Sequence, residues 1–209
     1  MKKTIIGSMV IISTLLLSAC SFGNNKPLEI VTDEYDFDDN IKSINLDISF
    51  EDVHIMESDD DKCHIVFTHP ENPKTVVEVK KDTLVISEYF SFSLDNYSSD
   101  FDDTKLDIYL PQSELKEIDI DTASGDITIS NITAYTIDID TASGDIAFDD
   151  IDADTIKIDT TSGDISGTLL SGKDFEVDTM SGSISVPSDS EGGSCDIDTV
   201  SGDVDLKVN

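Results

Sequence analysis

The chain has 209 residues, of which 38% are hydrophobic, so it is long enough to form one domain or elongated array with a buried core. Asp and Glu number 45 against 13 basic residues, all of them Lys, and the formal net charge is −32. Because nucleic-acid binding requires Lys and Arg to neutralise phosphates, this balance argues against a nucleic-acid partner. The chain has no Trp and few aromatic residues, so its core must be mainly aliphatic.

Residues 1–19 are predicted to be a lipoprotein signal peptide. Two lysines precede the apolar run Ile5–Leu17, which is short for a transmembrane helix. The run ends in Leu17-Ser18-Ala19-Cys20, which resembles the bacterial lipoprotein signal. The resemblance implies cleavage before Cys20 and acylation of that residue, for example with palmitate, and two acyl chains would give stable anchoring. We therefore expect a lipid-anchored protein on the extracytoplasmic face of the cell membrane; the alternative is an ordinary secretory signal with an incidental cysteine.

Residues 20–40 are predicted to be the lipidated cysteine, a polar tether and an acidic lead-in. The tether contains Gly23 and Pro27, which favour irregular structure. The lead-in, Leu28–Asn40, mixes acids with aromatic residues, and we interpret it as an irregular cap.

Residues 41–117 show alternation of apolar and polar residues, which predicts half-buried strands. The expected strands cover residues 44–50, 53–55, 64–68, 75–79, 83–87 and 105–110. Between the last two lies Phe90–Asp103, which is interpreted either as an aromatic recognition loop or as an inserted loop that packs over the edge of the fold.

Residues 118–209 repeat the motif Asp-Thr-x-Ser-Gly-Asp, with small departures. Its glycines fall at 125, 144, 163, 182 and 202, in steps of 19, 19, 19 and 20 residues. A fixed short period indicates a repeat architecture. The sequence therefore predicts an all-β fold, a β-solenoid (β-helix-like) of stacked coils of about 19 residues. Because Asp47–Ile55 aligns with Asp121–Ile129 at an offset of 74 residues, close to four periods, we interpret residues 41–117 as degenerate coils with loop insertions.

Four apolar positions of each repeat are predicted to form inward columns. The columns are Ile118, Ile137, Ile156, Phe175 and Cys195; Ile120, Ile139, Ile158, Val177 and Ile197; Ile127, Ile146, Ile165, Ile184 and Val204; and Ile129, Phe148, Gly167, Val186 and Leu206. The inward phase resumes at Ile127, an odd number of residues after Ser124, so Ser-Gly-Asp must be a corner. Glycine suits a positive φ at that corner, and the Thr and Ser of the motif are expected to hydrogen-bond there.

Acidic residues are predicted to form outward columns. These are Asp121, Asp140, Asp159, Asp178 and Asp198; Asp126, Asp145, Asp164, Ser183 and Asp203; and Asp119, Asp138, Lys157, Glu176 and Asp196. Like charges opposed across neighbouring strands are destabilising, so something must offset their repulsion. Either each Asp accepts backbone N–H bonds at the corner, or the columns bind a divalent cation such as Ca²⁺.

The repeats, preceded by Leu106-Asp107-Ile108-Tyr109-Leu110-Pro111, resemble the bacterial putative-adhesin family of β-solenoid domains. The resemblance is specific over residues 106–209 and weaker over 41–105. It implies an all-β solenoid at the cell envelope and identifies no catalytic residues.

Few residues outside the repeats are candidates for chemistry. Cys63 and Cys195 are predicted to be free, buried thiols, because Cys195 occupies an inward column and Cys63 lies far back in the chain. Cys63 and His64 alternate faces, so only one of them can face His69, and a metal site there is not expected. Five copies of Ser-Gly-Asp suit a corner better than a unique nucleophile.

The predicted function is a non-catalytic cell-surface lipoprotein, a scaffold or adhesin-like interaction module at the bacterial envelope, with no cofactor. Its expected partners are the membrane, through Cys20, and an envelope protein or a surface glycan. Two alternatives remain: a Ca²⁺-dependent binding module that uses the Asp columns, and a glycan-active β-helix enzyme that uses paired carboxylates.

Overall fold

The computed structural model describes residues 30–70, 74–89, 103–185 and 194–205. The predicted signal peptide, Cys20, the tether and residues 90–102 lie outside the described residues, so those predictions stay predictions. In the described part of the chain, no helix has the length and apolar character needed to cross a bilayer.

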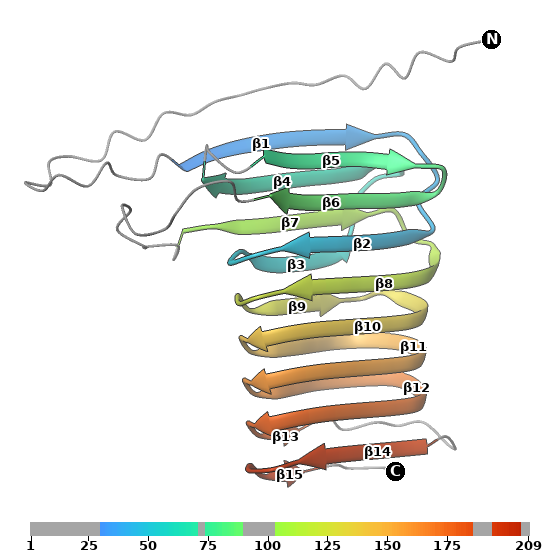
Figure 1. The fold of residues 1–209 in the computed structure, drawn as a ribbon. Coiled ribbons are helices and arrows are strands. Elements are labelled where there is room, and N and C mark those ends of the chain that lie inside the picture. The colour runs from blue at the N-terminus through green and yellow to red at the C-terminus, as the bar shows by residue number, and fades with distance from the viewer. Residues whose placement is uncertain (1–29, 71–73, 90–102, 186–193, 206–209) are drawn as a thin grey trace, which may run out of the picture.

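The regular structure of the described residues is entirely β, in one sheet of fifteen strands that curls over on itself into two facing layers (Figure 1). The strands are β1 (Ile30–Phe37), β2 (Ser43–Ile48), β3 (Asp52–Glu57), β4 (Cys63–Pro70), β5 (Lys74–Lys80), β6 (Thr83–Tyr89), β7 (Lys105–Leu110), β8 (Glu114–Thr122), β9 (Ile127–Ser130), β10 (Thr133–Ser143), β11 (Ile146–Ser162), β12 (Ile165–Ser181), β13 (Ile184–Ser185), β14 (Ser194–Thr199) and β15 (Val204–Asp205). The predicted all-β class is confirmed, and the arrangement is β-solenoid-like.

From β8 onward, equivalent positions of successive repeats pair in parallel and in register. Ile137 pairs with Ile118 on one side and with Ile156 on the other. β11 and β12 are each 17 residues long, and their two halves belong to different layers. β11, for example, pairs through its first half with β9 and through its second half with β10, so the chain passes from one layer to the other within a strand.

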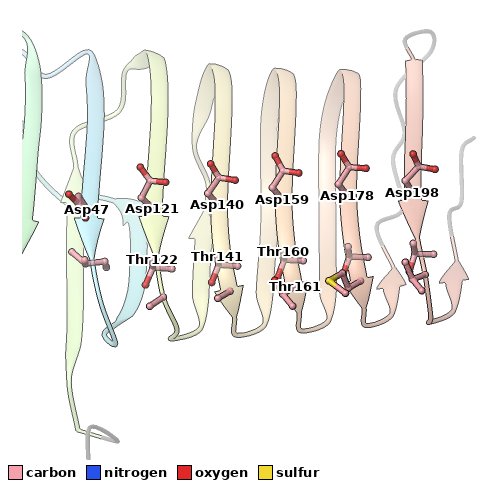
Figure 2. A pocket seen from close by; sticks show the side chains of 17 residues that line it. Asp47, Asp121, Thr122, Asp140, Thr141, Asp159, Thr160, Thr161, Asp178 and Asp198 are labelled. Carbon is pink, nitrogen blue, oxygen red and sulfur yellow. The ribbon is translucent and has the colours of Figure 1, made fainter. Parts of the chain in front are cut away.

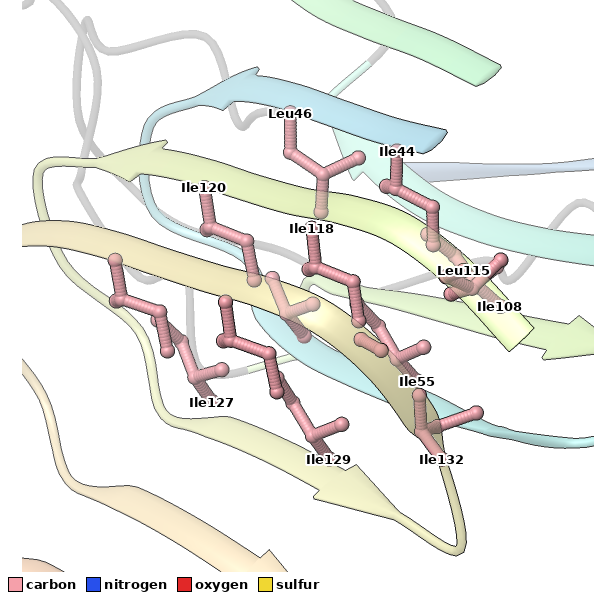
Figure 3. Packing of buried hydrophobic residues seen from close by; sticks show 14 of the residues in the cluster. Ile44, Leu46, Ile55, Ile108, Leu115, Ile118, Ile120, Ile127, Ile129 and Ile132 are labelled. Carbon is pink, nitrogen blue, oxygen red and sulfur yellow. The ribbon is translucent and has the colours of Figure 1, made fainter. Parts of the chain in front are cut away.

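The core is the space between the two layers. Ile118, Ile120, Ile137 and Ile139 are completely buried, as the alternation predicted. Figure 3 shows isoleucines of β8 and β9 filling this space. Burying one such side chain contributes roughly 1.5–3 kcal/mol, so a coil gains stability only when a neighbouring coil covers it.

The N-terminal strands differ from the predicted coils. β2 and β3 pair directly with β8 and β9, so the 74-residue offset corresponds to one step of the stack and not to four. β6 and β7 continue the parallel layers, but β5, β4 and β1 are added antiparallel at the far end (Figure 1). β1, β4 and β5 therefore form an antiparallel cap, because alternation predicts a strand without predicting its direction.

The acidic lead-in also differs from its prediction as an irregular cap. Most of it is β1, which pairs antiparallel with β4 over Ile30–Phe37. Tyr35 and Phe37 pack against the core, while Glu34 and Asp36, which alternate with them, are exposed. The aromatic residues therefore supply the buried face of an alternating strand.

The last described coil corrects one prediction about cysteine. Cys63 is free and buried as predicted, whereas Cys195 is free and exposed. Among the described strands, β14 pairs only with β12, so the inward face at Cys195 is covered on one side alone. Val204, at another inward position of this coil, is 45% exposed for the same reason.

Candidate functional site

The repeat corner, formed by Ser124-Gly125-Asp126 and its equivalents, holds adjacent coils at a fixed close distance. Gly144 has φ +120°, and a Cβ added to it would lie 2.1 Å from the carbonyl oxygen of Gly125. Gly163 has φ +129° and stacks on Gly144 in the same way. The prediction of a positive φ is confirmed, and the glycines are also required because backbone packs directly on backbone.

The corner Asp column, which we define as Asp52, Asp126, Asp145 and Asp164, links each coil to the next. Oδ1 of Asp126 accepts the backbone N–H of Asp145 at 2.8 Å, and Oδ1 of Asp145 accepts that of Asp164 at 2.8 Å. The same pattern begins at Asp52, whose Oδ1 accepts the N–H of Asp126 at 2.9 Å. The predicted corner bonding is therefore confirmed for this column, and each bond crosses from one coil to the next.

The threonines of the motif stabilise the corner from inside. Oγ1 of Thr122 and Oγ1 of Thr141 each donate to the carbonyl oxygen two residues later, at 2.9 Å. Thr141 is only 7% exposed, so this bond satisfies a buried hydroxyl. The threonine column is structural, as predicted.

The groove Asp column is a second row of acids with a different environment. It comprises Asp47, Asp121, Asp140, Asp159, Asp178 and Asp198, all of which line one groove of about 860 Å³. Figure 2 shows these side chains on the same side of successive strands, with the threonine row beside them. Within the described part of the chain, no hydrogen bond or ion pair reaches any of these six carboxylates.

The electrostatics of the groove column show its uncompensated charge. The pKa of Asp121 is raised above its usual value, first by partial burial and then by the nearby charges of Asp119, Asp140, Asp47 and Asp138. Strands of adjacent coils are about 4.8 Å apart, so each carboxylate inside the row has a like charge on both sides, and Asp47 and Asp198 at its ends have one on a single side. This column therefore has the structural capacity to attract positive charge.

The opposite side of the groove is small or apolar, a feature that the sequence analysis did not identify. It is formed by the variable third residue of the motif, which is Ala123, Ala142, Thr161, Met180 and Val200 in successive coils. Met180 is 60% exposed and Val200 is 81% exposed. The sequence could have predicted this row, because its residue lies two positions after the outward Asp and therefore shares the same face of the strand.

The third acidic column is partly paired. Nζ of Lys157 lies 3.9 Å from Oε2 of Glu176, and Nδ2 of Asn45 donates to Oδ2 of Asp119 at 2.6 Å. The basic residue in this column therefore offsets part of the local charge. The column lies beside the groove and does not line it.

The histidine and cysteine candidates are held by local polar contacts. His64 contacts Asp36 through Nδ1 at 2.6 Å and Asp60 through Nε2 at 2.9 Å, and these carboxylates raise the pKa of its imidazole. Burial raises the pKa of the Cys63 thiol to about 12, which makes it a poor nucleophile. In the described residues, no group of three or more His, Cys, Asp or Glu side chains is arranged to hold a metal ion.

Fold and groove together define an all-β repeat domain with an elongated acidic surface. The chain belongs to the Toastrack family, DUF4097, whose profile matches residues 41–209. The match includes β4 and β5 of the antiparallel cap as well as the regular repeats, and β1 lies before it. Among curated proteins, no match was found.

Solved structures that match this chain come from several bacteria. A putative cell adhesion protein from Clostridium sporogenes is 14% identical, with 85% of this chain and 100% of that chain covered and a TM-score of 0.49. A putative adhesin from Bacteroides fragilis is 16% identical, with coverage of 85% and 97% and a TM-score of 0.44. A putative lipid binding protein from Parabacteroides distasonis is 18% identical, with coverage of 85% and 96% and a TM-score of 0.39. Similarity at this level does not identify a ligand.

Proposed function

We propose that this protein is a non-catalytic interaction module of stacked coils, anchored through Cys20 on the extracytoplasmic face of the cell membrane, that binds a basic, extended segment of an envelope protein. The binding surface is the groove between the groove Asp column and the small or apolar row that begins at Ala123. The observation that supports this function is the row of six carboxylates without a hydrogen bond or ion pair from the described residues.

Charge favours a basic partner. Two unit charges at the coil spacing repel by roughly 1 kcal/mol in a water-like dielectric, and a lysine placed between them replaces this repulsion with attraction. The third acidic column already contains such an arrangement, because Lys157 lies beside Glu176. An acidic surface glycan would add further negative charge to the groove, so a basic protein segment is the better fit.

The spacing of the coils favours an extended partner. A polyproline II segment rises about 3.1 Å per residue, so three residues span about 9.3 Å, close to the distance between alternate coils. A lysine at every third position would therefore meet every second carboxylate of the groove Asp column. The residues between the lysines would lie against the row that contains Met180 and Val200.

A synthetic peptide tests this site. We expect the protein to bind a peptide of about twelve residues with Lys at every third position and Ala or Val between, because its charges match the coil spacing. The combined substitutions Asp140→Asn, Asp159→Asn and Asp178→Asn should weaken binding at least about tenfold, as measured by isothermal titration calorimetry at moderate salt.

The matched control removes the same charge elsewhere. Glu114, Glu117 and Asp149 are exposed and lie outside the groove. A control variant that combines Glu114→Gln, Glu117→Gln and Asp149→Asn therefore has the same net charge as the groove variant, with the groove itself unchanged. Equal weakening by both triple variants would show that total charge, and not the groove, binds the peptide. A peptide of the same composition with its lysines clustered should bind more weakly than the spaced one.

Calcium is the alternative ligand for the same carboxylates. The described residues contain no formed chelating group, so a cation would have to be held by carboxylates from neighbouring coils alone. A shift of the melting temperature in millimolar Ca²⁺ that the groove variant abolishes would favour this alternative over the peptide-binding groove.

The lipid anchor has its own test. We expect Cys20→Ala to move the protein from the membrane fraction to the soluble fraction, because the residue can no longer be acylated. Membrane fractionation with immunoblotting measures this, and Cys63→Ala is the control, because that thiol is buried in the folded domain. Unchanged fractionation of the Cys20 variant would contradict the anchor and leave the groove experiment unaffected.

A further inference from the structure

Two buried glutamates meet beside the first turn of the parallel layers. Glu51 is fully buried in the turn between β2 and β3, and Glu88 is 6% exposed near the end of β6. Glu51 occupies the position that glycine takes in the regular corners, since a Cβ on Gly125 would lie 2.3 Å from the Glu51 carbonyl oxygen. A glutamate therefore replaces glycine in the turn between β2 and β3, next to the first regular corner.

The carboxylate of Glu51 accepts backbone N–H groups of its own turn. In the next corner, the N–H of Ser124 donates to the carbonyl oxygen of Ser49 at 3.0 Å. At the equivalent position in its own turn, the N–H of Phe50 donates to Oε2 of Glu51 at 3.0 Å, and the N–H of Ser49 donates to the same oxygen at 3.2 Å. Two backbone donors therefore converge on one oxygen of Glu51.

Two of the three remaining oxygens of the pair have no donor among the described residues. Oε1 of Glu51 and Oε2 of Glu88 are buried and receive no hydrogen bond from the described residues. The other oxygen of Glu88 has only a long contact, 3.5 Å, with Oγ1 of Thr75 on β5. Two adjacent buried carboxylates cannot both carry charge at low cost, and one proton between them supplies the missing donor.

We propose that Glu88 is protonated and donates to Glu51, so that the pair is a proton-dependent latch between the end of β6 and the turn that starts the groove. The other polar groups near it are Thr75 on β5, Asp47 on β2, whose backbone pairs with that of Ser87, and Asp52 after the turn. In the described part of the chain, no lysine or histidine forms an ion pair with either glutamate. Burial raises the pKa of Glu88 to about 8, and the charge of Glu51 and their mutual hydrogen bond add to the effect.

The sign of the pH dependence follows from this raised pKa. In the unfolded chain Glu88 ionises near its ordinary pKa of 4.5, whereas in the folded protein it holds its proton until about pH 8. The stabilising contribution of the Glu88 proton is complete below pH 4.5 and is lost as the pH rises towards 8. Within this window the folding equilibrium constant falls by up to about tenfold per pH unit. Above pH 8 the turn opens more readily, and the groove loses a fixed end because Asp47 and Ile48 belong to it.

The experiment compares the wild-type protein with Glu88→Gln. The glutamine amide can donate to Oε1 of Glu51 at every pH. Between pH 5 and 9, the urea midpoint of this variant should therefore fall less than that of the wild type. Glu57→Gln, an exposed change on β3, is the control and should follow the wild type. A carboxyl-¹³C NMR titration of the wild type should show one glutamate with a pKa near 8.

Three results would overturn the latch. One is a wild-type protein in which no glutamate titrates above the ordinary range. Another is a Glu88→Gln variant that folds and loses stability with rising pH as steeply as the wild type does. The third is a chelator that lowers the wild-type melting temperature but not that of the variant, since a cation would then occupy the pair. If the variant does not fold, the NMR titration of the wild type decides alone.

Discussion

Gly163→Ala is expected to unfold the C-terminal coils. The new Cβ would lie 2.0 Å from the Gly144 carbonyl oxygen, where no real side chain fits, and the residue would keep a φ of +129°. A strained backbone costs about 1–3 kcal/mol, and the collision adds to it, so we expect a loss of about 4 kcal/mol or more. A domain of this kind has a total stability of about 5–15 kcal/mol, so urea unfolding followed by circular dichroism should show the change clearly.

Thr161→Ala is the control for this substitution. Thr161 lies two residues before Gly163, is exposed, and corresponds to Ala123 and Ala142 in other coils. Its replacement should change the free energy of unfolding by less than about 0.5 kcal/mol. Equal effects of the two changes, or a stable Gly163→Ala protein, would contradict backbone-on-backbone stacking at the corner.

Ile139→Ala is the second change with a large expected effect. Ile139 is completely buried and lies in register between Ile120 and Ile158 of the neighbouring coils. Truncating such a side chain removes packing and leaves a cavity, at a cost of about 4 kcal/mol. Chemical denaturation with a tyrosine fluorescence or circular dichroism signal measures the loss.

The adjacent residue provides the matched control for the core. Asp138→Ala changes the neighbouring position, which faces outward on the same strand. It removes one charge from the third acidic column and should leave the free energy of unfolding within about 0.5 kcal/mol of the wild type. If Asp138→Ala were as destabilising as Ile139→Ala, the assigned inward and outward phases would be wrong.

The repeats were predictable because the same motif and the same apolar positions recur in each of them. The odd step between Ser124 and Ile127 located the corner, and the invariant Gly located its positive φ. The sequence did not separate the two Asp columns, since both follow the same spacing. Which oxygen accepts an N–H from the next coil depends on the backbone path around Gly125, and no single repeat encodes that path.

The antiparallel cap was not predictable because alternation specifies burial and not strand direction. Thr83–Ser87 and Thr75–Val79 have the same pattern, yet the first is parallel to its neighbour β2 and the second is antiparallel to β6. The 74-residue offset resembles four periods only because one repeat step is lengthened by an insertion of about three periods. One member of the buried glutamate pair could have been identified from the sequence, since Glu51 stands where the motif has Gly. Its partner Glu88 could not, because it is distant in sequence and belongs to no repeat position.

The corner Asp column makes the parallel repeats that it links a nearly one-dimensional cooperative system. Each acceptor bond runs only to the following coil, as from Asp126 to Asp145, so nearest neighbours set the stability of every coil. Opening should start at an end and proceed coil by coil, while central coils such as the one around Ile139 exchange their amide protons last. A ligand that spans several coils of the groove would then suppress this fraying in proportion to the length that it covers.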